Sequence, residues 1–291
     1  MTEEDPGMDY TMAAAPTDAW RVYDKAAPVP GYYQFDWLSA RHPDLYDRFA
    51  LTTVGLMDEF LRLVDLAGLD VVDVGAGTGR STIAAARSAR HVDAVDAYHA
   101  VVEFGRNAVR EAGLTNVTYH IGDRSRLPFP DSSRDAVICV WAELDHREAA
   151  RVLKNGGILA HLGPATGSEA GELSAVLTSN SQLRTTASSS TWNLAPNLIR
   201  GDVVTPKLFD PALPAEDTDI PKDDWGGATL AGPIHRHDFS YVADYGSVDE
   251  AVAINGRLLG PAAAAYLAER RQATVAWRLR IHYARIARNR T

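Results

Sequence analysis

The 291-residue sequence has little cysteine, no excess of positive charge and no long apolar run. Its one cysteine, Cys139, lies in an apolar segment and cannot form a disulfide within the chain, so we expect it to be buried in a strand. Acidic residues outnumber Lys and Arg by 38 to 29, which argues against a nucleic-acid partner. No apolar stretch approaches the roughly 20 residues of a membrane span, and the acidic N-terminus is not a secretory signal. These absences predict a soluble cytoplasmic protein with neither a membrane nor a nucleic acid as partner.

The most informative stretch is VVDVGAGTGRST, residues 71–82. The apolar residues before Gly75 predict a short buried strand, and residues 81–89 predict a helix. Between them, Gly75, Gly77 and Gly79 lack a Cβ, so the backbone can take positive φ and a ligand can approach closely. A strand, a glycine turn and a helix start form the first βα unit of a nucleotide-binding sheet.

The spacing of these glycines indicates which class of ligand the loop can bind. Dinucleotide-binding folds require Gly-x-Gly-x-x-Gly, whereas this chain has Gly-x-Gly-x-Gly and no Gly-Lys-Ser/Thr phosphate loop. A nicotinamide-dependent oxidoreductase therefore stays an alternative that the spacing, and the lack of a Tyr-x-x-x-Lys element, disfavour. Asp73 places a carboxylate beside the loop, which suits a ligand carrying a positive ammonium group.

The segment Asp73 to Gly79 resembles motif I of the class I S-adenosylmethionine (SAM)-dependent methyltransferases. The resemblance covers roughly residues 50–165 and 233–286. It implies SAM as cofactor and S-adenosylhomocysteine (SAH) as product, with the methionine part over the glycine loop. A non-catalytic protein that keeps the SAM-binding fold is a further alternative.

The remaining pattern predicts a Rossmann-like α/β fold with helices on both faces of a mostly parallel seven-stranded sheet. We expect strands at 69–74, 91–96, 117–121, 135–140, 158–162, 234–243 and 274–284, and helices at 50–67, 99–112, 148–153 and 248–267. The resemblance implies that the seventh strand is antiparallel and inserted between the fifth and sixth. We divide the chain into a tail and aromatic lid segment (1–49), a SAM-binding core (50–162), a substrate-recognition insertion after strand five (163–232) and the C-terminal part of the core (233–291).

Further cofactor contacts are expected where the second and third strands end. Asp96 follows Gly75 by about 20 positions, the place of an acid that accepts hydrogen bonds from ribose hydroxyls. The resemblance implies that Asp123 binds the adenine amino group and that Arg124 offers a backbone N–H near the ring. The predicted cofactor-binding residues are Asp73, Gly75, Ala76, Gly77, Gly79, Asp96, Ala97, Gly122, Asp123, Arg124, Val140 and Trp141.

The end of the fourth strand, WAELDH at residues 141–146, should face the methyl group and the acceptor. Trp141 can wall the transfer site, whereas Glu143, Asp145 and His146 either bind substrate or cap the next helix. His161, near the end of the fifth strand, is either a base or a core residue. The predicted catalytic residues are Trp141, Glu143, His146 and His161.

Six aromatic residues crowd positions 31–49, either as a helix docked on the core or as a lid over the ligands. The predicted substrate-binding residues are Tyr32, Tyr33, Trp37, Glu143, Asp145, His235 and His237. The two histidines share one face of a predicted strand, but a third ligand is not evident at close spacing, so we expect no metal.

Methyl transfer from a sulfonium is an in-line displacement in which the protein supplies alignment and desolvation. The acidic balance, and the carboxylates after strand four, favour a cationic amine acceptor, such as a peptide N-terminal amine in natural-product biosynthesis. The alternative is an O-methyltransferase that uses His161 or His146 as base. We expect a small-molecule or peptide substrate and a monomer or homodimer.

Overall fold

The computed structural model describes residues 39, 42–165, 173 and 228–288, and the structural statements below concern these residues. The predicted substrate residues Tyr32, Tyr33 and Trp37 lie outside this part of the chain, as does most of the predicted insertion 163–232.

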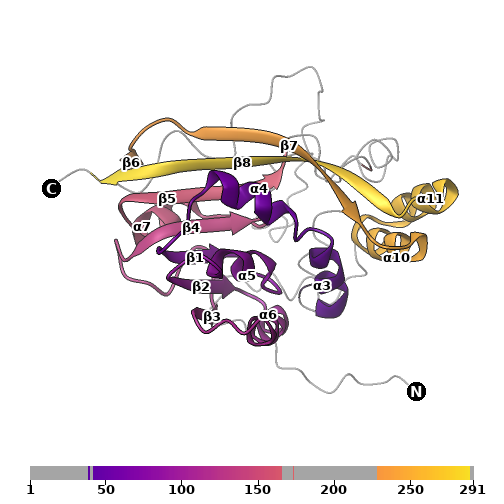
Figure 1. The fold of residues 1–291 in the computed structure, drawn as a ribbon, viewed down its shortest axis with the longest axis horizontal. Coiled ribbons are helices and arrows are strands. Elements are labelled where there is room, and N and C mark those ends of the chain that lie inside the picture. Colours follow the sequence, from indigo (N-terminus) through magenta and orange to yellow (C-terminus); the bar gives the residue numbers. More distant parts are fainter. Residues whose placement is uncertain (1–38, 40–41, 166–172, 174–227, 289–291) are drawn as a thin grey trace, which may run out of the picture.

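A single sheet organises the described residues (Figure 1). Its strands are β1 (Asp70–Val74), β2 (His91–Asp96), β3 (Val117–Ile121), β4 (Arg134–Val140), β5 (Leu153–Pro164), β6 (Ala228–Leu230), β7 (His235–Asp244) and β8 (Thr274–Arg288). The order is β3-β2-β1-β4-β5-β8, and both β6 and β7 pair with β8. Strands β1 to β5 are parallel to one another, whereas β8 runs antiparallel to β5, β6 and β7.

The predicted Rossmann-like architecture is confirmed, including an antiparallel last strand between the fifth strand and the predicted sixth, which is β7. Two details of the strand prediction were wrong. Strand β5 begins at Leu153 rather than at residue 158, because the Gly156-Gly157 pair continues the strand across an irregularity in the register with β4 instead of forming a turn. Strand β6 falls in the range assigned to the insertion and was not predicted, since three residues carry too little pattern.

The helices are α3 (Pro43–Leu51), α4 (Leu56–Leu63), α5 (Arg80–Ala86), α6 (His99–Glu111), α7 (His146–Val152), α10 (Val248–Leu259) and α11 (Pro261–Arg270). The predicted helix 50–67 is therefore two helices. The hydroxyls of Thr52 and Thr53 donate to the carbonyls of Phe49 and Ala50 at 2.7 Å and end α3. The predicted helix 248–267 is also divided, because Gly260 takes φ +91° and Pro261 begins a new helix.

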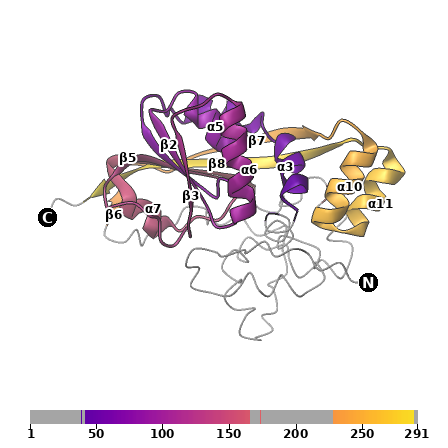
Figure 2. The same ribbon diagram turned by 90° about the horizontal axis from the view of Figure 1, so that it is seen from below.

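Helices cover both faces of the sheet, as predicted (Figure 2). On one face, Phe60 of α4 and Ala85 of α5 pack against Ile138 and Ala160 of the central strands, and α6 lies beside α5. On the other face, α7 packs its Ala150 against the strand residues Val137 and Leu159. None of the helices described here combines the length and the hydropathy that crossing a bilayer requires.

The parallel strands all end at the same edge of the sheet. Strand β1 lies between β2 and β4, so the chain changes direction across the sheet there, and a crevice at the carboxyl ends of β1 and β4 is the usual ligand position in such folds. Beyond this edge lie α3 and the long β7–β8 ribbon with α10 and α11 at its end (Figure 1). These elements enclose the region in which the predicted site residues fall.

Candidate cofactor and methyl-transfer site

The glycine loop has the left-handed geometry that its sequence predicts. Gly75, Gly77 and Gly79 take φ values of +72°, +54° and +95°. The amides of Gly75 and Ala76 both donate to the carbonyl of Val95, at 2.9 and 3.1 Å, and tie the loop to the end of β2. Gly79 is the N-cap of α5. The loop thus passes directly from β1 to a helix start, and the space left by the absent side chains is occupied by Ala142 at Gly75, Tyr46 at Gly77 and Tyr119 at Gly79.

Asp73 lies beneath this loop and is fully buried. Its Oδ2 accepts hydrogen bonds from the hydroxyls of Ser81 and Thr82 at 2.7 and 2.6 Å. Its Oδ1 has no hydrogen-bond partner among the described residues. Burial raises the pKa of Asp73 to about 6, despite the two hydroxyl donors. A buried, half-satisfied carboxylate is costly, and a cationic group placed beside it would remove that cost.

Asp96, at the end of β2, is tied to the same loop. Its Oδ2 accepts from the amide of Gly77 at 2.8 Å, and its Oδ1 accepts from the amide of Tyr98 at 3.0 Å. Burial raises the pKa of this carboxyl as well. Each carboxylate oxygen keeps a second lone pair, so the geometry is compatible with hydroxyl donors from a ribose. The bond to Gly77 was not part of the sequence prediction, because it depends on how β2 meets the loop.

The loop after β3 contributes the other predicted cofactor residues. The amide of Gly122 donates to the carbonyl of Asp96 at 3.0 Å, which holds the two strand ends together. The Oδ1 of Asp123 accepts from the amide and hydroxyl of Ser125, at 2.7 and 2.6 Å, and so stabilises a local turn. Arg124 forms an ion pair with Glu143 and so links the loops that follow β3 and β4.

Trp141 follows Val140 at the end of β4 and is a backbone exception. Its φ is +58°, a value that non-glycine residues rarely take, and its amide donates to the carbonyl of Leu162 at 2.7 Å. Its ring meets those of Phe49 and Trp277 edge-on, with centroids 5.7 and 4.9 Å away. The indole nitrogen of Trp277 is buried without a hydrogen-bond partner in the described part of the chain. These three rings form an aromatic wall at the carboxyl end of β4, in which Phe49 and Trp277 are buried and Trp141 is partly buried.

Sequence reasoning identified Trp141 as a wall but missed its two partners. Phe49 belonged to the aromatic segment 31–49, and its burial at 4% exposure shows that this end of the segment docks on the core. Trp277 was predicted only as part of a strand. Its position in the wall follows from the antiparallel insertion of β8, which local pattern does not encode.

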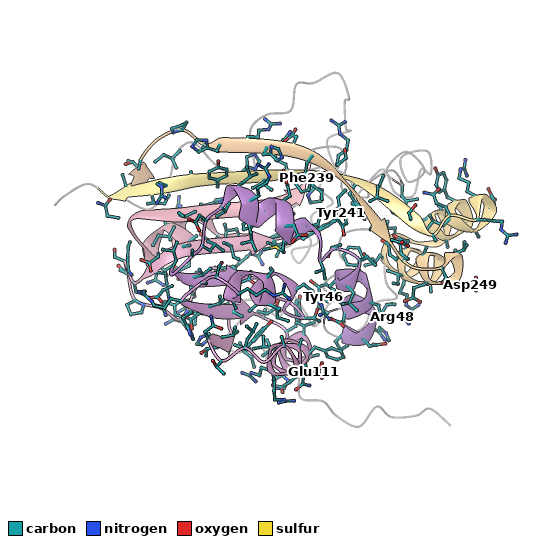
Figure 3. All side chains as sticks on the ribbon, viewed as in Figure 1. Tyr46, Arg48, Glu111, Phe239, Tyr241 and Asp249 are labelled. Atoms are coloured by element: carbon teal, nitrogen blue, oxygen red, sulfur yellow. The ribbon has the colours of Figure 1, made fainter. Side chains whose placement is uncertain are left out.

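The other end of α3 covers the glycine loop. The hydroxyl oxygen of Tyr46 would lie 2.8 Å from a Cβ added at Gly77, so its ring rests directly on that glycine. The neighbouring Asp47 accepts a hydrogen bond from Arg80, in the first turn of α5, at 2.5 Å. In Figure 3, Tyr46 lies on the side of α3 that faces the sheet. Residues 43–49 thus form a docked helix, one of the two predicted roles, and Tyr46 of this helix lies over the glycine loop.

The predicted catalytic groups after β4 are engaged in local structure. Asp145 is the N-cap of α7 and accepts from the amides of Arg147 and Glu148 at 3.0 Å, which is the capping alternative. His146 is the first residue of α7 and is partly buried. The Nε2 of His161 lies 3.1 Å from the carbonyl oxygen of Ala142.

His235 and His237 lie apart from these residues. They are on β7, and four strand spacings separate β7 from β1, about 19 Å. His235 stacks on Tyr283 with ring centroids 4.7 Å apart, and the Nε2 of His237 lies 2.6 Å from the Oε1 of Glu59 in α4. The structure does not bring the two histidines to the glycine loop. No cluster of three or more metal-ligating side chains occurs among the described residues.

The residues around the loop fit SAM. Three buried polar atoms there have no hydrogen-bond partner in the described ranges: Asp73 Oδ1, Thr78 Oγ1 and Arg80 Nε. Such atoms are costly in an interior and are expected where a polar ligand binds. A carboxylate for the ammonium group, a second carboxylate for the ribose and a glycine backbone between them match the polar groups of SAM.

Comparison with known proteins agrees with this geometry. Residues 71–157 match a family model described as a methyltransferase domain. The chain is 36% identical over 127 residues to a demethylmenaquinone methyltransferase of Tropheryma whipplei, covering 39% of this chain and 52% of that protein. It is 39% identical over 72 residues to phosphoethanolamine N-methyltransferase 1 of Caenorhabditis elegans, covering 25% and 15%. The crystal structure of YcgJ from Bacillus subtilis aligns with a TM-score of 0.46 at 19% identity, covering 80% and 98%.

The chain spans about half the length, or less, of the curated relatives it matches. Within that span, residues 71–157 match the methyltransferase-domain model, and the resemblance to class I SAM-dependent methyltransferases is confirmed. The comparisons also support SAM as the cofactor, as predicted.

Proposed function

We propose that this protein transfers a methyl group from SAM to a small-molecule or peptide acceptor. The observation that carries the proposal is the pair of buried carboxylates on the glycine loop. Asp96 is hydrogen-bonded to Gly77, and Asp73 has an oxygen without a partner among the described residues. When bound, the cofactor supplies an electrophilic methyl group. Asp73 would hold its ammonium group, and Asp96 would accept hydrogen bonds from its ribose.

The protein's remaining contribution is positioning and exclusion of water. Tyr46 covers Gly77, and the aromatic wall of Phe49, Trp141 and Trp277 borders the end of β4. A dry, rigid site of this kind favours in-line displacement, because the acceptor is held close and its nucleophilic atom loses water. No covalent step on the protein is required.

An amine nitrogen is the first acceptor to test, including a peptide N-terminal amine in natural-product biosynthesis. An amine can lose its proton to water at modest cost and needs no dedicated base. The similarity to a phosphoethanolamine N-methyltransferase is consistent with this choice. The assay is transfer of a labelled methyl group from SAM to a panel of amines and short peptides.

A neutral ring is a second acceptor class, which one specific observation favours. The two carboxylates after β4 that suggested a cationic acceptor are engaged elsewhere, Glu143 with Arg124 and Asp145 at the start of α7. Trp141, the partly buried ring of the aromatic wall, remains at that edge as a surface for recognition. The similarity to demethylmenaquinone methyltransferases accords with a ring acceptor. Phenols and quinols, whose electron-rich rings can attack the methyl group and then lose a proton, therefore belong in the same panel, and phenols also test O-methylation with a histidine base.

The first experiment is calorimetric titration of the purified protein with SAM, SAH and NADH in parallel. Micromolar binding of SAM or SAH without binding of NADH supports the proposal. Binding of NADH alone would overturn it and favour an oxidoreductase. Binding of SAM with no transfer to any acceptor class would favour a non-catalytic SAM-binding protein.

A further inference from the structure

Two hydrogen-bond donors on adjacent strands converge on one backbone carbonyl beside the glycine loop. Cys139 of β4 and His161 of β5 are register partners, so their side chains share one face of the sheet. The Sγ of Cys139 and the Nε2 of His161 each lie 3.1 Å from the carbonyl oxygen of Ala142. A carbonyl oxygen only accepts, which assigns the Nε2–H tautomer to His161. Burial raises the pKa of the Cys139 thiol and keeps it a donor.

The converging donors act on a strained segment. Trp141, one residue before Ala142, takes φ +58°. A non-glycine residue stays in this region only where its surroundings hold it there. The amide of Trp141 bonds to Leu162 of β5 on one side, and the carbonyl of Ala142 receives the two donors on the other. Three hydrogen bonds from the central strands thus fix the turn that follows β4.

That turn touches the cofactor loop directly. A Cβ added at Gly75 would lie 2.3 Å from the Cβ of Ala142, so the alanine methyl fills the space that the glycine leaves. Any shift of Ala142 is therefore transmitted to Gly75, whose amide is bonded to Val95 of β2. The contact joins the end of β4 to the loop on which the cofactor is proposed to rest.

We propose that His161 is a positioning residue: with Cys139 as a weaker second donor, it holds the turn at Trp141 and Ala142 against Gly75 and so sets the shape of the SAM site. This inference rests on the proposed function and gives His161 a role other than that of a base. An imidazole whose Nε2–H is donated to a backbone carbonyl cannot accept an acceptor's proton at that nitrogen.

The test is SAH affinity, measured by calorimetry on the intact protein, with folding checked by circular dichroism. His161→Leu should weaken SAH binding by about tenfold, because the partly buried carbonyl of Ala142 loses its main donor. His161→Gln, whose amide nitrogen reaches the Nε2 position, should restore most of the affinity. If the leucine variant does not fold, His161→Asn replaces it in the test. The shorter asparagine side chain does not reach the carbonyl of Ala142, so this variant should bind SAH as weakly as is expected for His161→Leu.

A second readout does not depend on the cofactor. Cys139 is the only cysteine of the chain, so its reaction with a thiol-specific disulfide reagent reports on this turn alone. The reaction should be faster in His161→Leu and close to wild type in His161→Gln. His91→Leu, at the amino end of β2, is the matched control and should change neither SAH affinity nor thiol reactivity.

The possible outcomes separate this inference from the proposed function. Failure of the wild-type protein to bind SAH would count against the function, and thiol reactivity would still test the positioning role. If the wild type binds SAH while the leucine and asparagine variants match it in affinity and thiol reactivity, the positioning role is wrong. The role is also wrong if His161→Gln loses as much affinity as His161→Leu.

Discussion

Replacing Gly75 with alanine is the sharpest test of how the turn after β4 supports the glycine loop. The new Cβ would lie 2.3 Å from the Cβ of Ala142, far inside van der Waals contact. The backbone at Gly75 also has φ +72°, which disfavours any side chain. The substitution therefore combines backbone strain with a steric clash between two packed segments.

The structure allows these two effects to be separated. Gly113 has φ +69°, and a Cβ added there meets nothing within 4 Å. Gly113→Ala should therefore cost only the left-handed backbone penalty, about 1 kcal/mol. Gly75→Ala should cost that amount and, in addition, about 1–3 kcal/mol for overpacking. The predicted difference between the two variants is thus about 1–3 kcal/mol in the free energy of unfolding.

Urea unfolding followed by circular dichroism measures these free energies, and calorimetry with SAH measures the effect on the site. The double variant with Gly75→Ala and Ala142→Gly removes the clashing methyl, so its stability should return towards that of Gly113→Ala. SAH binding should weaken in Gly75→Ala and stay unchanged in Gly113→Ala. Equal destabilisation by the two single variants, or no recovery in the double variant, would refute the reasoning.

Three further predictions concern charged groups of the site. Asp96→Ala should lower SAH affinity by about tenfold or more, because the amide of Gly77 loses its acceptor together with the proposed ribose contacts; unchanged affinity in calorimetry would remove the ribose assignment. Because the folded-state pKa of Asp73 is raised to about 6, ionising it opposes folding as pH rises through that value. Asp73→Asn should then raise the free energy of unfolding at pH 8 by up to about 3 kcal/mol and give no gain below about pH 4, while weakening SAH binding; an equal gain at both pH values would contradict this. Arg124→Gln and Glu143→Gln should weaken SAH binding to a similar extent, and the double variant should lose about 0.5–1 kcal/mol less than the sum of the two single losses; additive losses would show that the pair does not act as a unit.

The sequence was most informative where structure is local. Three glycines at alternate positions after a buried strand predicted a left-handed turn, and Gly75, Gly77 and Gly79 all take positive φ. The place of the antiparallel last strand was implied by the family resemblance and not by the residue pattern, and the structure confirms it. Boundaries were less accurate where competing local bonds decide them, as at Thr52 and Thr53, whose hydroxyls end α3 inside a continuous apolar pattern.

Side-chain partners across the sheet could not be predicted. The sequence placed Trp141 at the end of β4 but gave no reason for Phe49 and Trp277 to meet it, since one lies on α3 and the other on the inserted antiparallel strand. The same is true of His161. Its spacing suggested a base or a core residue, whereas its hydrogen bond to Ala142 depends on the left-handed turn of the preceding strand end.

The structure alters the prediction of the methyl acceptor more than any other prediction made from the sequence. Carboxylates after β4 favoured a cation when they were counted as charges in the sequence, but charge recognises a ligand only when it is not already neutralised. Glu143 is paired with Arg124, and Asp145 accepts two backbone amides of α7. What remains at this edge is Trp141, the partly buried ring of the aromatic wall, whose face can contact a planar neutral ring or a cation with similar chemistry. The acceptor panel should therefore compare amines and neutral rings of similar size, because shape rather than formal charge is the feature that this edge of the sheet can select.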